Sequence, residues 1–455
     1  MHYPAKKQRL LLAIVACTLA PPLLFAQSPE EYAGRRQAVR AAMEPNSVMI
    51  LRAAATDSED APARRENNLY YLTGIDEPGA ALVLYAEAKG GEGGPARAAG
   101  PREVLFVAAA GAAARAPAGA SKPPERPGFE SVRPAAEFPS YLDGILLGPI
   151  PVVYLDQRRS RSLSSPLTDD EQLLKQARDR GAAFTLKPAA PLIAPLRRIK
   201  SPAEIEILKT AAAITVEAQK EAMRTARPGL YEYQLQSVIE HVFSINGARR
   251  PGFASIVGSG PNSCILHWSE NTRKMEAGDL VVVDIGAEYQ RYTADITRTI
   301  PVSGTFTKRQ RDIYEIVLAA NRAAIEMLGP GVEMRDVNAK VDEILAAGLV
   351  KLGLIQDRSG LRRYYIHGLS HSIGLQVHDV GTLGRLEPGM VITIEPGLYL
   401  RDEGLGVRIE DDVLITDSGR LVLTAGAPKA VDEVERLMKE EGLDFSRYLL
   451  RPPAP

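Results

Sequence analysis

Apolar and polar residues alternate along this chain in blocks that predict strands and helices in turn. Short apolar runs bounded by polar residues predict strands at Ser47–Leu51, Ala81–Tyr85, Val104–Val107 and Val152–Leu155. Helical spacing of apolar residues predicts helices at Pro29–Met43 and Asp169–Arg180. Strands that alternate with helices indicate a first α/β domain over residues 27–195. Its Gly-, Ala- and Pro-rich stretches are interpreted as loops or insertions, at Lys89–Gly100 and Ala108–Pro127.

A second pattern begins near Pro191–Ser201. Ser201 can cap a helix that starts at Pro202, and Glu204 completes a capping box, so a helix is predicted to about Ala226. Further helices are predicted at Tyr231–Ile245, from Thr307 to Gly329, and at Met334–Leu352. Strands are predicted at Asp279–Ile285, Tyr292–Pro301, Val391–Ile394 and Val407–Thr416. Long helices beside hairpin-like strands indicate an α+β domain with a curved antiparallel sheet over residues 196–445, followed by a tail at 446–455.

The first 26 residues are typical of an export signal. Basic residues at Lys6, Lys7 and Arg9 precede an apolar run that ends near Ala26, which predicts a cleaved signal peptide and a periplasmic or secreted protein. A second interpretation is a lipobox that ends at Cys17, whose lipidation would anchor the protein to a membrane. The third interpretation is an uncleaved membrane anchor. The chain has two cysteines, Cys17 and Cys264, so the processed protein can form no internal disulfide.

Composition excludes several classes of protein. Of the 455 residues, 45% are hydrophobic and 24% are charged, as in ordinary globular proteins. Fifty-five basic residues balance 56 acidic ones, for a formal net charge of −1, which does not suggest a nucleic-acid partner. The net charge gives no information, however, about where the acidic residues cluster.

Two aspartates occur where a strand pattern makes an unpaired carboxylate costly to bury. Asp284 ends the run Leu280–Val283, and Asp295 follows Tyr292 in the next predicted strand. If these strands form a hairpin about Tyr289-Gln290, Asp284 and Asp295 lie directly opposite, with Cβ atoms about 5 Å apart. Two carboxylates that close repel unless a cation or a shared proton lies between them.

Two glutamates and a group of histidines extend the candidate site. Glu395 follows the strand Val391–Ile394, and Glu410 lies inside the predicted strand Val407–Thr416. Each acid alone is more often an ion-paired surface group, but four of them at strand ends in one domain favour a site. Among the six histidines, four lie in motif-like settings, namely His267, His367, His371 and His378.

Two Asp, two Glu and one His make an oxygen-rich set of ligands. Such a set suits manganese, cobalt or iron better than a structural zinc site, which prefers Cys and His. Five ligands with carboxylates that can bridge suit a pair of metal ions, which can supply a hydroxide nucleophile at neutral pH. The sequence therefore predicts metal-assisted hydrolysis.

The chain resembles the pita-bread metallopeptidases, and most closely the bacterial Xaa-Pro aminopeptidases (aminopeptidase P). The resemblance rests on stretches whose order and spacing match over most of residues 200–430, namely Ser255–Asn271, Asp279–Ser303, His367–Gly381, Glu387–Tyr399 and Gly406–Thr416. Upstream, Arg65–Gly74 resembles the creatinase-type N-terminal domain of that family. The resemblance implies a pita-bread (creatinase/aminopeptidase-like) catalytic domain preceded by an α/β creatinase-type domain.

The resemblance also implies a role for each candidate residue. Two divalent ions, most often Mn²⁺ in the family, would be held by Asp284, Asp295, His371, Glu395 and Glu410. Glu395 would also handle the proton of the attacking water, and His267 and His378 would hold the substrate and stabilise the intermediate. His367 and Arg408 would line the substrate cleft.

The implied activity is removal of the N-terminal residue from peptides that have proline in second position. A prolidase restricted to Xaa-Pro dipeptides shares the five ligands and stays open as an alternative. A remote alternative is a non-catalytic binding module on the same fold. Such modules have lost metal ligands, whereas this chain keeps all five. Family members are often dimers or tetramers. Departures from the family include Ser372, where a bulky aromatic often follows the metal-binding histidine, and Tyr70, where relatives can carry Trp.

Overall fold

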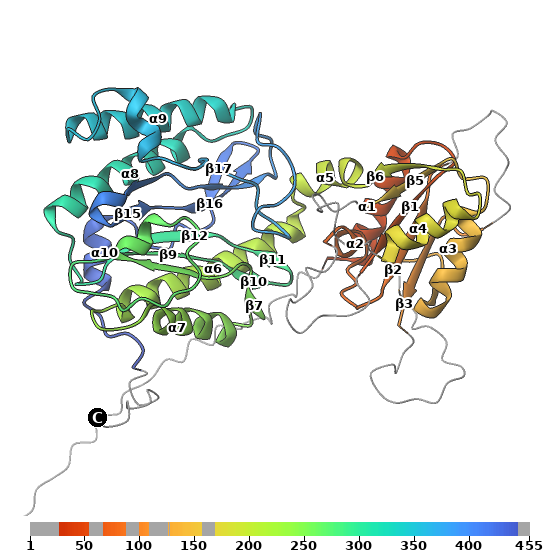
Figure 1. Ribbon diagram of the computed structural model, residues 1–455, viewed down its shortest axis with the longest axis horizontal. Helices are drawn as coiled ribbons and strands as arrows, with labels where there is room; N and C mark the ends of the chain where they lie inside the picture. The colour runs from red at the N-terminus through yellow and green to blue at the C-terminus, as the bar shows by residue number, and fades with distance from the viewer. Residues whose placement is uncertain are drawn as a thin grey trace, which may run out of the picture.

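The computed structural model describes residues 27–53, 67–87, 100–108, 126, 128–156 and 169–444 (Figure 1). The predicted signal peptide, almost all of the two Gly-, Ala- and Pro-rich stretches, and the tail at 446–455 lie outside these residues. Within the described residues, no helix has the length and apolar character needed to cross a membrane.

The first part of the chain forms a six-stranded mixed sheet in the order β4-β3-β2-β1-β5-β6. The strands and helices of this part have the following bounds: β1 Ser47–Arg52, β2 Ala81–Tyr85, β3 Glu103–Val107, β4 Val132–Pro134, β5 Val152–Leu155, β6 Thr185–Pro188, α1 Pro29–Ala42, α2 Asn67–Thr73, α3 Phe138–Leu146, α4 Asp169–Asp179 and α5 Ala190–Arg198. The four predicted strands and the two predicted helices are confirmed. Alternate residues of β1 belong to two separate hydrophobic clusters, Val48 and Ile50 to one and Met49 and Leu51 to the other. Both faces of this sheet are therefore covered.

The second part packs long helices against small antiparallel sheets around the largest hydrophobic cluster. Its helices are α6 Pro202–Thr225, α7 Glu232–Ile245, α8 Lys308–Met327, α9 Met334–Lys351 and α10 Val431–Leu437. Its strands are β7 Arg250–Pro251, β8 Ile256–Ser259, β9 Leu280–Ile285, β10 Ala287–Tyr289, β11 Tyr292–Thr293, β12 Ile296–Pro301, β13 Val391–Ile394, β14 Gly397–Leu400, β15 Leu405–Arg408, β16 Asp411–Thr416 and β17 Gly419–Val422. Figure 1 shows α6 and α7 on one side of these strands and α8 and α9 on the other.

Helix α6 starts where the sequence predicts. The Ser201 hydroxyl accepts a hydrogen bond from the backbone N–H of Glu204, and the Glu204 carboxylate accepts one from the N–H of Ser201. This reciprocal capping box satisfies backbone donors that the first helical turn leaves open. The same device opens α8 at Thr307 and Gln310.

The hairpin that carries Asp284 has a different register from the predicted one. Tyr289 pairs with Tyr292, so the two turn residues are Gln290 and Arg291, both with positive φ. Positive φ at both positions is the geometry of a type I′ turn, whose twist fits a two-residue hairpin. Asp284 therefore lies opposite Thr297, and the predicted direct opposition of Asp284 and Asp295 is wrong. The shift is two residues, and a shift by an even number keeps a side chain on its face of the sheet.

Two predicted strands are broken at an acidic residue. The run Tyr292–Pro301 divides into β11 and β12 with Asp295 between them, and Val407–Thr416 divides into β15 and β16 with Glu410 between them. The prediction that Glu410 lies within a continuous strand is wrong. Its backbone N–H donates instead to Thr297 O of β12, and β15 and β16 pair with different partners, β14 and β13.

Candidate metal centre

Four carboxylates from separate strand ends converge on His371. The Nε2 atom of His371 lies 3.5 Å from Asp295 Oδ2, 3.5 Å from Glu395 Oε1 and 4.0 Å from Glu410 Oε1. Asp295, His371 and Glu410 each offer a ligand atom within 4.8 Å of the others. Asp284, the fourth acid, is close enough to raise the pKa of Asp295, Glu395 and Glu410. The structure thus brings together the five residues that the sequence predicts as ligands.

Burial makes this cluster of acids electrostatically costly. Burial, together with repulsion from Glu410 and Asp284, raises the pKa of Asp295 well above its usual value. Burial and the neighbouring Glu395 and Asp284 do the same to Glu410. Burial also raises the pKa of Glu395 to about 8, although the Arg408 guanidinium opposes this shift. The ionised forms of these groups need a cation beside them.

The surroundings of the His371 ring fix its orientation and keep it neutral, as a metal ligand requires. Its Nδ1 atom lies 3.1 Å from Ser372 O, and a carbonyl can only accept a hydrogen bond, so the ring hydrogen lies on Nδ1. The Nε2 lone pair then faces the carboxylates, which is the arrangement of a metal-binding histidine with an oriented second nitrogen. Burial and the nearby His378 lower the pKa of His371 to about 4, so the ring stays neutral at physiological pH.

Asp284 is oriented by a buried arginine. The Nη2 atom of Arg408 donates to Asp284 Oδ2 at 2.6 Å, and its Nη1 atom donates to the Tyr399 hydroxyl at 2.9 Å. Its Nε donates to the hydroxyl of Thr297, which itself donates to Glu410 Oε2 at 2.6 Å. The guanidinium, only 3% exposed, is therefore engaged with protein groups on every nitrogen.

The remaining histidines lie around the carboxylates. The His378 ring is perpendicular to that of His371 at a centroid distance of 4.4 Å, and His267 follows at 6.5 Å from His378. His367 lies 2.8 Å from the Tyr399 hydroxyl through Nε2, and its Nδ1 is 3.7 Å from Glu395 Oε2. His267 and His378 are exposed. The predicted catalytic and substrate-binding histidines therefore lie beside the predicted ligands.

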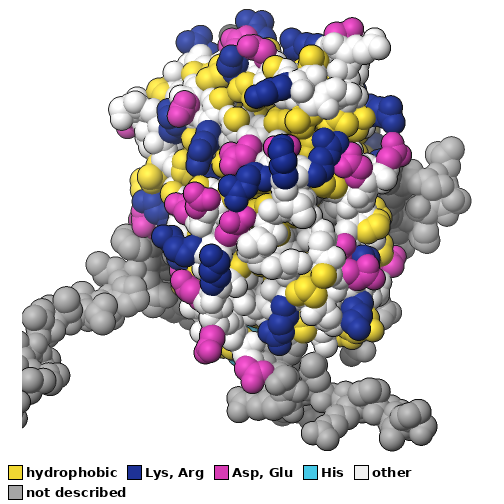
Figure 2. Space-filling view, turned by 90° about the vertical axis from the view of Figure 1, so that its left-hand side faces the viewer, with side chains coloured by type: hydrophobic (Ala, Val, Ile, Leu, Met, Phe, Trp, Pro, Cys, Tyr) yellow, Lys and Arg dark blue, Asp and Glu magenta, His cyan; other side chains and the backbone are white. Residues whose placement is uncertain are grey.

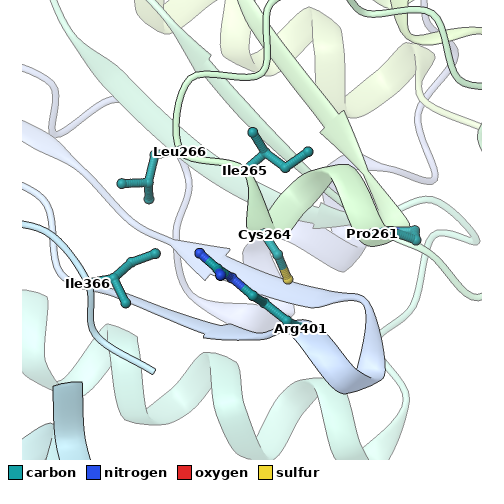
Figure 3. Close-up of a pocket in the computed structure, with 6 residues that line it drawn as sticks. All are labelled: Pro261, Cys264, Ile265, Leu266, Ile366 and Arg401. Carbon is teal, nitrogen blue, oxygen red and sulfur yellow. The ribbon is translucent and has the colours of Figure 1, made fainter. Parts of the chain in front are cut away.

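A shallow cavity of about 520 Å³ adjoins the histidines. It is lined by Pro261, Cys264, Ile265, Leu266, Ile366 and Arg401. Two of these residues, Leu266 and Ile366, directly precede His267 and His367, and Figure 3 shows both beside one hollow along which the Arg401 side chain extends. The Leu266 carbonyl also accepts a hydrogen bond from Arg408. The cavity is therefore connected to the site through Leu266 and Ile366, while the histidines themselves do not line it.

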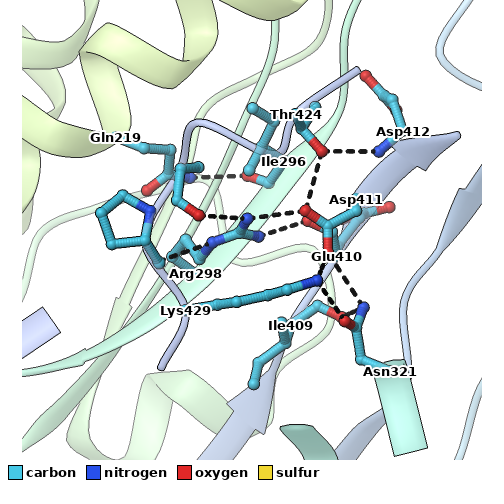
Figure 4. Close-up of polar contacts among 12 residues, drawn as sticks. Gln219, Ile296, Arg298, Asn321, Ile409, Glu410, Asp411, Asp412, Thr424 and Lys429 are labelled. Atoms are coloured by element: carbon cyan, nitrogen blue, oxygen red, sulfur yellow. Dashed lines mark hydrogen bonds and ion pairs between the residues drawn. The ribbon is translucent and has the colours of Figure 1, made fainter. Parts of the chain in front are cut away.

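Behind the acids lies a buried ion-pair network that the sequence did not indicate (Figure 4). The Arg298 guanidinium, 0% exposed, donates to Asp411 Oδ1 at 2.8 Å and to the carbonyl of Glu410 at 2.6 Å. Lys429 Nζ donates to the other oxygen of Asp411 at 2.6 Å. Burial raises the pKa of Asp411, but the two cations outweigh it and hold that pKa well below its usual range. The network fixes the carbonyl of Glu410 and the residue that follows it.

Two further polar residues of the site were missed from the sequence. Thr297 lies two residues beyond Asp295, and this spacing could have placed both near one face of the hairpin. The Tyr399 hydroxyl forms hydrogen bonds with both His367 and Arg408. In an alternating apolar strand, however, no sequence signal distinguishes a functional tyrosine from one in the hydrophobic core.

The donor set fits a divalent metal. Among the described residues, Asp284 Oδ1 and Asp295 Oδ1 are buried and receive no hydrogen bond, although buried carboxylate oxygens are normally satisfied. Carboxylate oxygens and one imidazole suit manganese, iron or cobalt. A cation in contact with these atoms would satisfy the oxygens and relieve the repulsion between the acids.

Metal removal is expected to destabilise the second domain. A ligand at 100 times its dissociation constant stabilises the folded state by about 2.7 kcal/mol, and the acids repel when it leaves. Treatment with a chelator should therefore lower the midpoint of thermal unfolding, and added metal should restore it. An unchanged midpoint in a sample shown to have lost its metal would contradict the assignment.

The outer face of this domain carries no dominant charge. Figure 2 shows Lys and Arg side chains interspersed with Asp and Glu on that face.

Comparisons with known proteins converge on one family. The family model described as metallopeptidase family M24 matches residues 206–417, and that described as the aminopeptidase P N-terminal domain matches residues 32–151. The Xaa-Pro aminopeptidase of Escherichia coli is 38% identical over 441 residues, covering 90% of this chain and 98% of that protein. The Xaa-Pro dipeptidase of Pyrococcus furiosus is 35% identical over 277 residues, covering 60% of this chain and 76% of that protein.

The similarity extends to three-dimensional structure. A variant of Escherichia coli aminopeptidase P solved in complex with substrate aligns with a TM-score of 0.79 and 37% identity, covering 90% of this chain and 98% of that one. Both parts of the fold are included in this alignment.

Proposed function

The chain belongs to the M24 metallopeptidases and carries the N-terminal domain of aminopeptidase P, and from this premise we propose how its site works. It is a metal-dependent aminopeptidase that hydrolyses the N-terminal Xaa-Pro bond. The observation that carries this conclusion is the convergence of His371 with buried Asp295 and Glu410 and with half-buried Glu395.

The proposed cofactor is a pair of Mn²⁺ ions. Asp284, Asp295, His371, Glu395 and Glu410 would hold them, which is more donor atoms than one four-coordinate ion uses. The oxygen-rich set favours manganese over zinc. When bound, such ions polarise the scissile carbonyl and lower the pKa of water.

The residues around the metal have roles of their own. Glu395 would take up the proton of the attacking water and is suited to passing it to the proline nitrogen as that nitrogen leaves. An Xaa-Pro bond lacks an N–H, so recognition of the bond cannot depend on that donor. The free amino group of the substrate would pair with the acids of the cleft instead.

The histidines and the arginine act at different places. His267 and His378 are exposed beside the ligands, where they can contact the substrate and donate to the oxygen that gains charge. The structure engages Arg408 with Asp284 and Tyr399, so we assign it to orienting these two groups and, with them, His367. The predicted positions of His367 near the substrate cleft and of Arg408 near the proline side of the scissile bond stay predictions.

Peptides longer than a dipeptide are the proposed substrates. The cavity of about 520 Å³ beside His267 and His367 offers room for atoms beyond an Xaa-Pro dipeptide. The Xaa-Pro aminopeptidase of Escherichia coli matches 90% of this chain, whereas the Xaa-Pro dipeptidase of Pyrococcus furiosus matches 60% of it.

Manganese-loaded enzyme is expected to cleave Ala-Pro-Ala and to lose this activity when a chelator is added. The assay compares kcat/KM for Ala-Pro-Ala and for the dipeptide Ala-Pro, with Ala-Ala-Ala as the control for proline specificity. Activity confined to Ala-Pro would establish the prolidase alternative. Cleavage that survives complete metal removal would contradict the metallopeptidase mechanism.

Export is a separate proposal, which rests on the basic and apolar pattern of residues 1–26. Cleavage after Ala26 would make Gln27 the first residue. The Gln27 side chain is buried, donates to the Tyr292 hydroxyl and accepts from Arg35, so the processed end would pack at the junction of the two domains. Mass spectrometry of protein from the periplasm or medium should show a chain that begins at or near Gln27. An intact Met1, or a lipid on Cys17, would contradict this cleavage.

A further inference from the structure

A cluster of buried charges lies where the two domains meet. Its acidic member is Asp379, the residue that follows His378 in the chain. Arg197, in the last turn of α5, donates through Nη2 to Asp379 Oδ1. Lys200 Nζ lies 3.7 Å from Asp379 Oδ2. The three side chains are 1–3% exposed, so these charges are removed from water.

The cluster is tied to the N-terminal domain. Arg197 Nη1 donates to Asn68 Oδ1 of α2 at 2.8 Å, and Asn68 Nδ2 donates to Asp156 Oδ2, directly after β5, at 2.7 Å. An unbroken chain of hydrogen bonds thus runs from the end of β5, an inner strand of the first sheet, to Asp379.

Asp379 in turn fixes the loop that carries two histidines of the site. Its backbone N–H donates to Ser372 O at 2.8 Å, which closes residues 372–379 into a ring. His371 directly precedes this ring and His378 lies inside it, and their side chains are held perpendicular at 4.4 Å. The loop packs so tightly on the carboxylate that a Cβ on Gly374 would lie 2.2 Å from Asp379 Oδ2.

Stability alone does not explain such a cluster. A buried ion pair is often no more stabilising than apolar residues of the same volume, because desolvation offsets the attraction. What an arginine with two fixed partners supplies is geometry, since its planar group directs both hydrogen bonds. The geometry that this arginine determines is the position of the loop around His378.

We propose that Arg197 is a positioning residue, which holds the loop of His378 in place through Asp379 and anchors it to the N-terminal domain through Asn68. The proposal rests on the role given to His378 in the proposed function. It assigns the N-terminal domain a part in catalysis without any contact between that domain and the substrate.

The experiment compares three variants of the full-length, manganese-loaded enzyme on Ala-Pro-Ala. Arg197→Lys keeps the charge but lacks the two separate nitrogens through which Arg197 bonds Asn68 and Asp379. Asn68→Ala removes only the link to the N-terminal domain. Arg198→Met is the matched control, because its exposed ion pair with Glu387 crosses between the same two parts of the chain. Metal content and thermal unfolding are measured on each variant, so that only folded, loaded protein is compared.

Misplacing a reacting group by a fraction of an ångström to about 1 Å costs up to roughly 100-fold in rate, so Arg197→Lys should lower kcat/KM by about 10-fold. Asn68→Ala should lower it by a smaller factor in the same direction, and Arg198→Met should leave it within about twofold. If Arg197→Lys keeps kcat/KM within about twofold at equal metal content, the proposal is overturned.

A double-mutant cycle separates positioning from general structural damage. In a His378→Ala background, Arg197→Lys should cause almost no further loss, because the group that it positions is gone. An equal fold-loss in both backgrounds would overturn the proposal. Full activity of His378→Ala by itself would instead contradict the role of His378 in the proposed function, so the two failures are distinguishable.

Discussion

Replacing Glu410 by alanine is expected to lower kcat/KM for Ala-Pro-Ala by at least about 1,000-fold, because metal ions contribute several kcal/mol of transition-state stabilisation. Glu410 Oε1 faces His371, and its Oε2 is held by the Thr297 hydroxyl, so alanine removes a donor that no neighbour can replace. The metal content of the purified variant, measured by elemental analysis, should fall together with the activity.

The matched control is Asp417→Ala, which removes an exposed acid shortly beyond β16. Its kcat/KM and metal content should stay within about twofold of the parent enzyme, as for most surface substitutions. A Glu410→Ala enzyme with full activity and full metal content would exclude Glu410 from the ligands. The same result for Asp295→Ala would contradict a two-metal site.

Arg298→Met is expected to destabilise the catalytic domain by about 3–5 kcal/mol, the usual cost of leaving a buried charge without its partner. Methionine fills similar space but leaves Asp411 with Lys429 as its only cation and removes the donor to the Glu410 carbonyl. Trp268 is the only tryptophan of the chain and lies in this domain, so its fluorescence reports urea unfolding of that domain. The midpoint of that transition should move to a lower urea concentration.

Arg309→Met provides the comparison, because the ion pair of Arg309 with Glu403 is solvent-exposed. Exposed pairs contribute about 0–1 kcal/mol, so this variant should unfold almost as the parent does. Equal, small effects of the two substitutions would show that the buried network does not stabilise the domain.

Local elements followed closely from the sequence. The start of α6 was predicted from Ser201, Pro202 and Glu204 because a capping box depends only on residues three positions apart. The strands of the first domain were likewise recognisable as short apolar runs. The turn at Gln290-Arg291 was not, since neither residue is the glycine that normally marks two positive φ angles.

The strand breaks at Asp295 and Glu410 could not be predicted from the pattern of apolar residues. Both residues lie in runs that read as continuous strands. The backbone of each residue forms a hydrogen bond with a distant side chain. The N–H of Asp295 donates to Asp412 Oδ2, and the Glu410 carbonyl accepts from Arg298. These partners are more than 100 residues away in the chain, so no local signal marks them.

The sequence by itself determined the candidate residues of the site, because a carboxylate at the end of an apolar strand and closely spaced histidines are unusual wherever the chain folds. It also determined the two-part architecture, through local periodicity. Only the tertiary structure decided how Asp284 is oriented by Arg408, how Arg298 secures Glu410, and how Arg197 connects the loop of His378 to the first domain. Those arrangements depend on contacts between distant segments, and their geometry exists only after the helices and sheets have packed and water has been excluded from the charges between them.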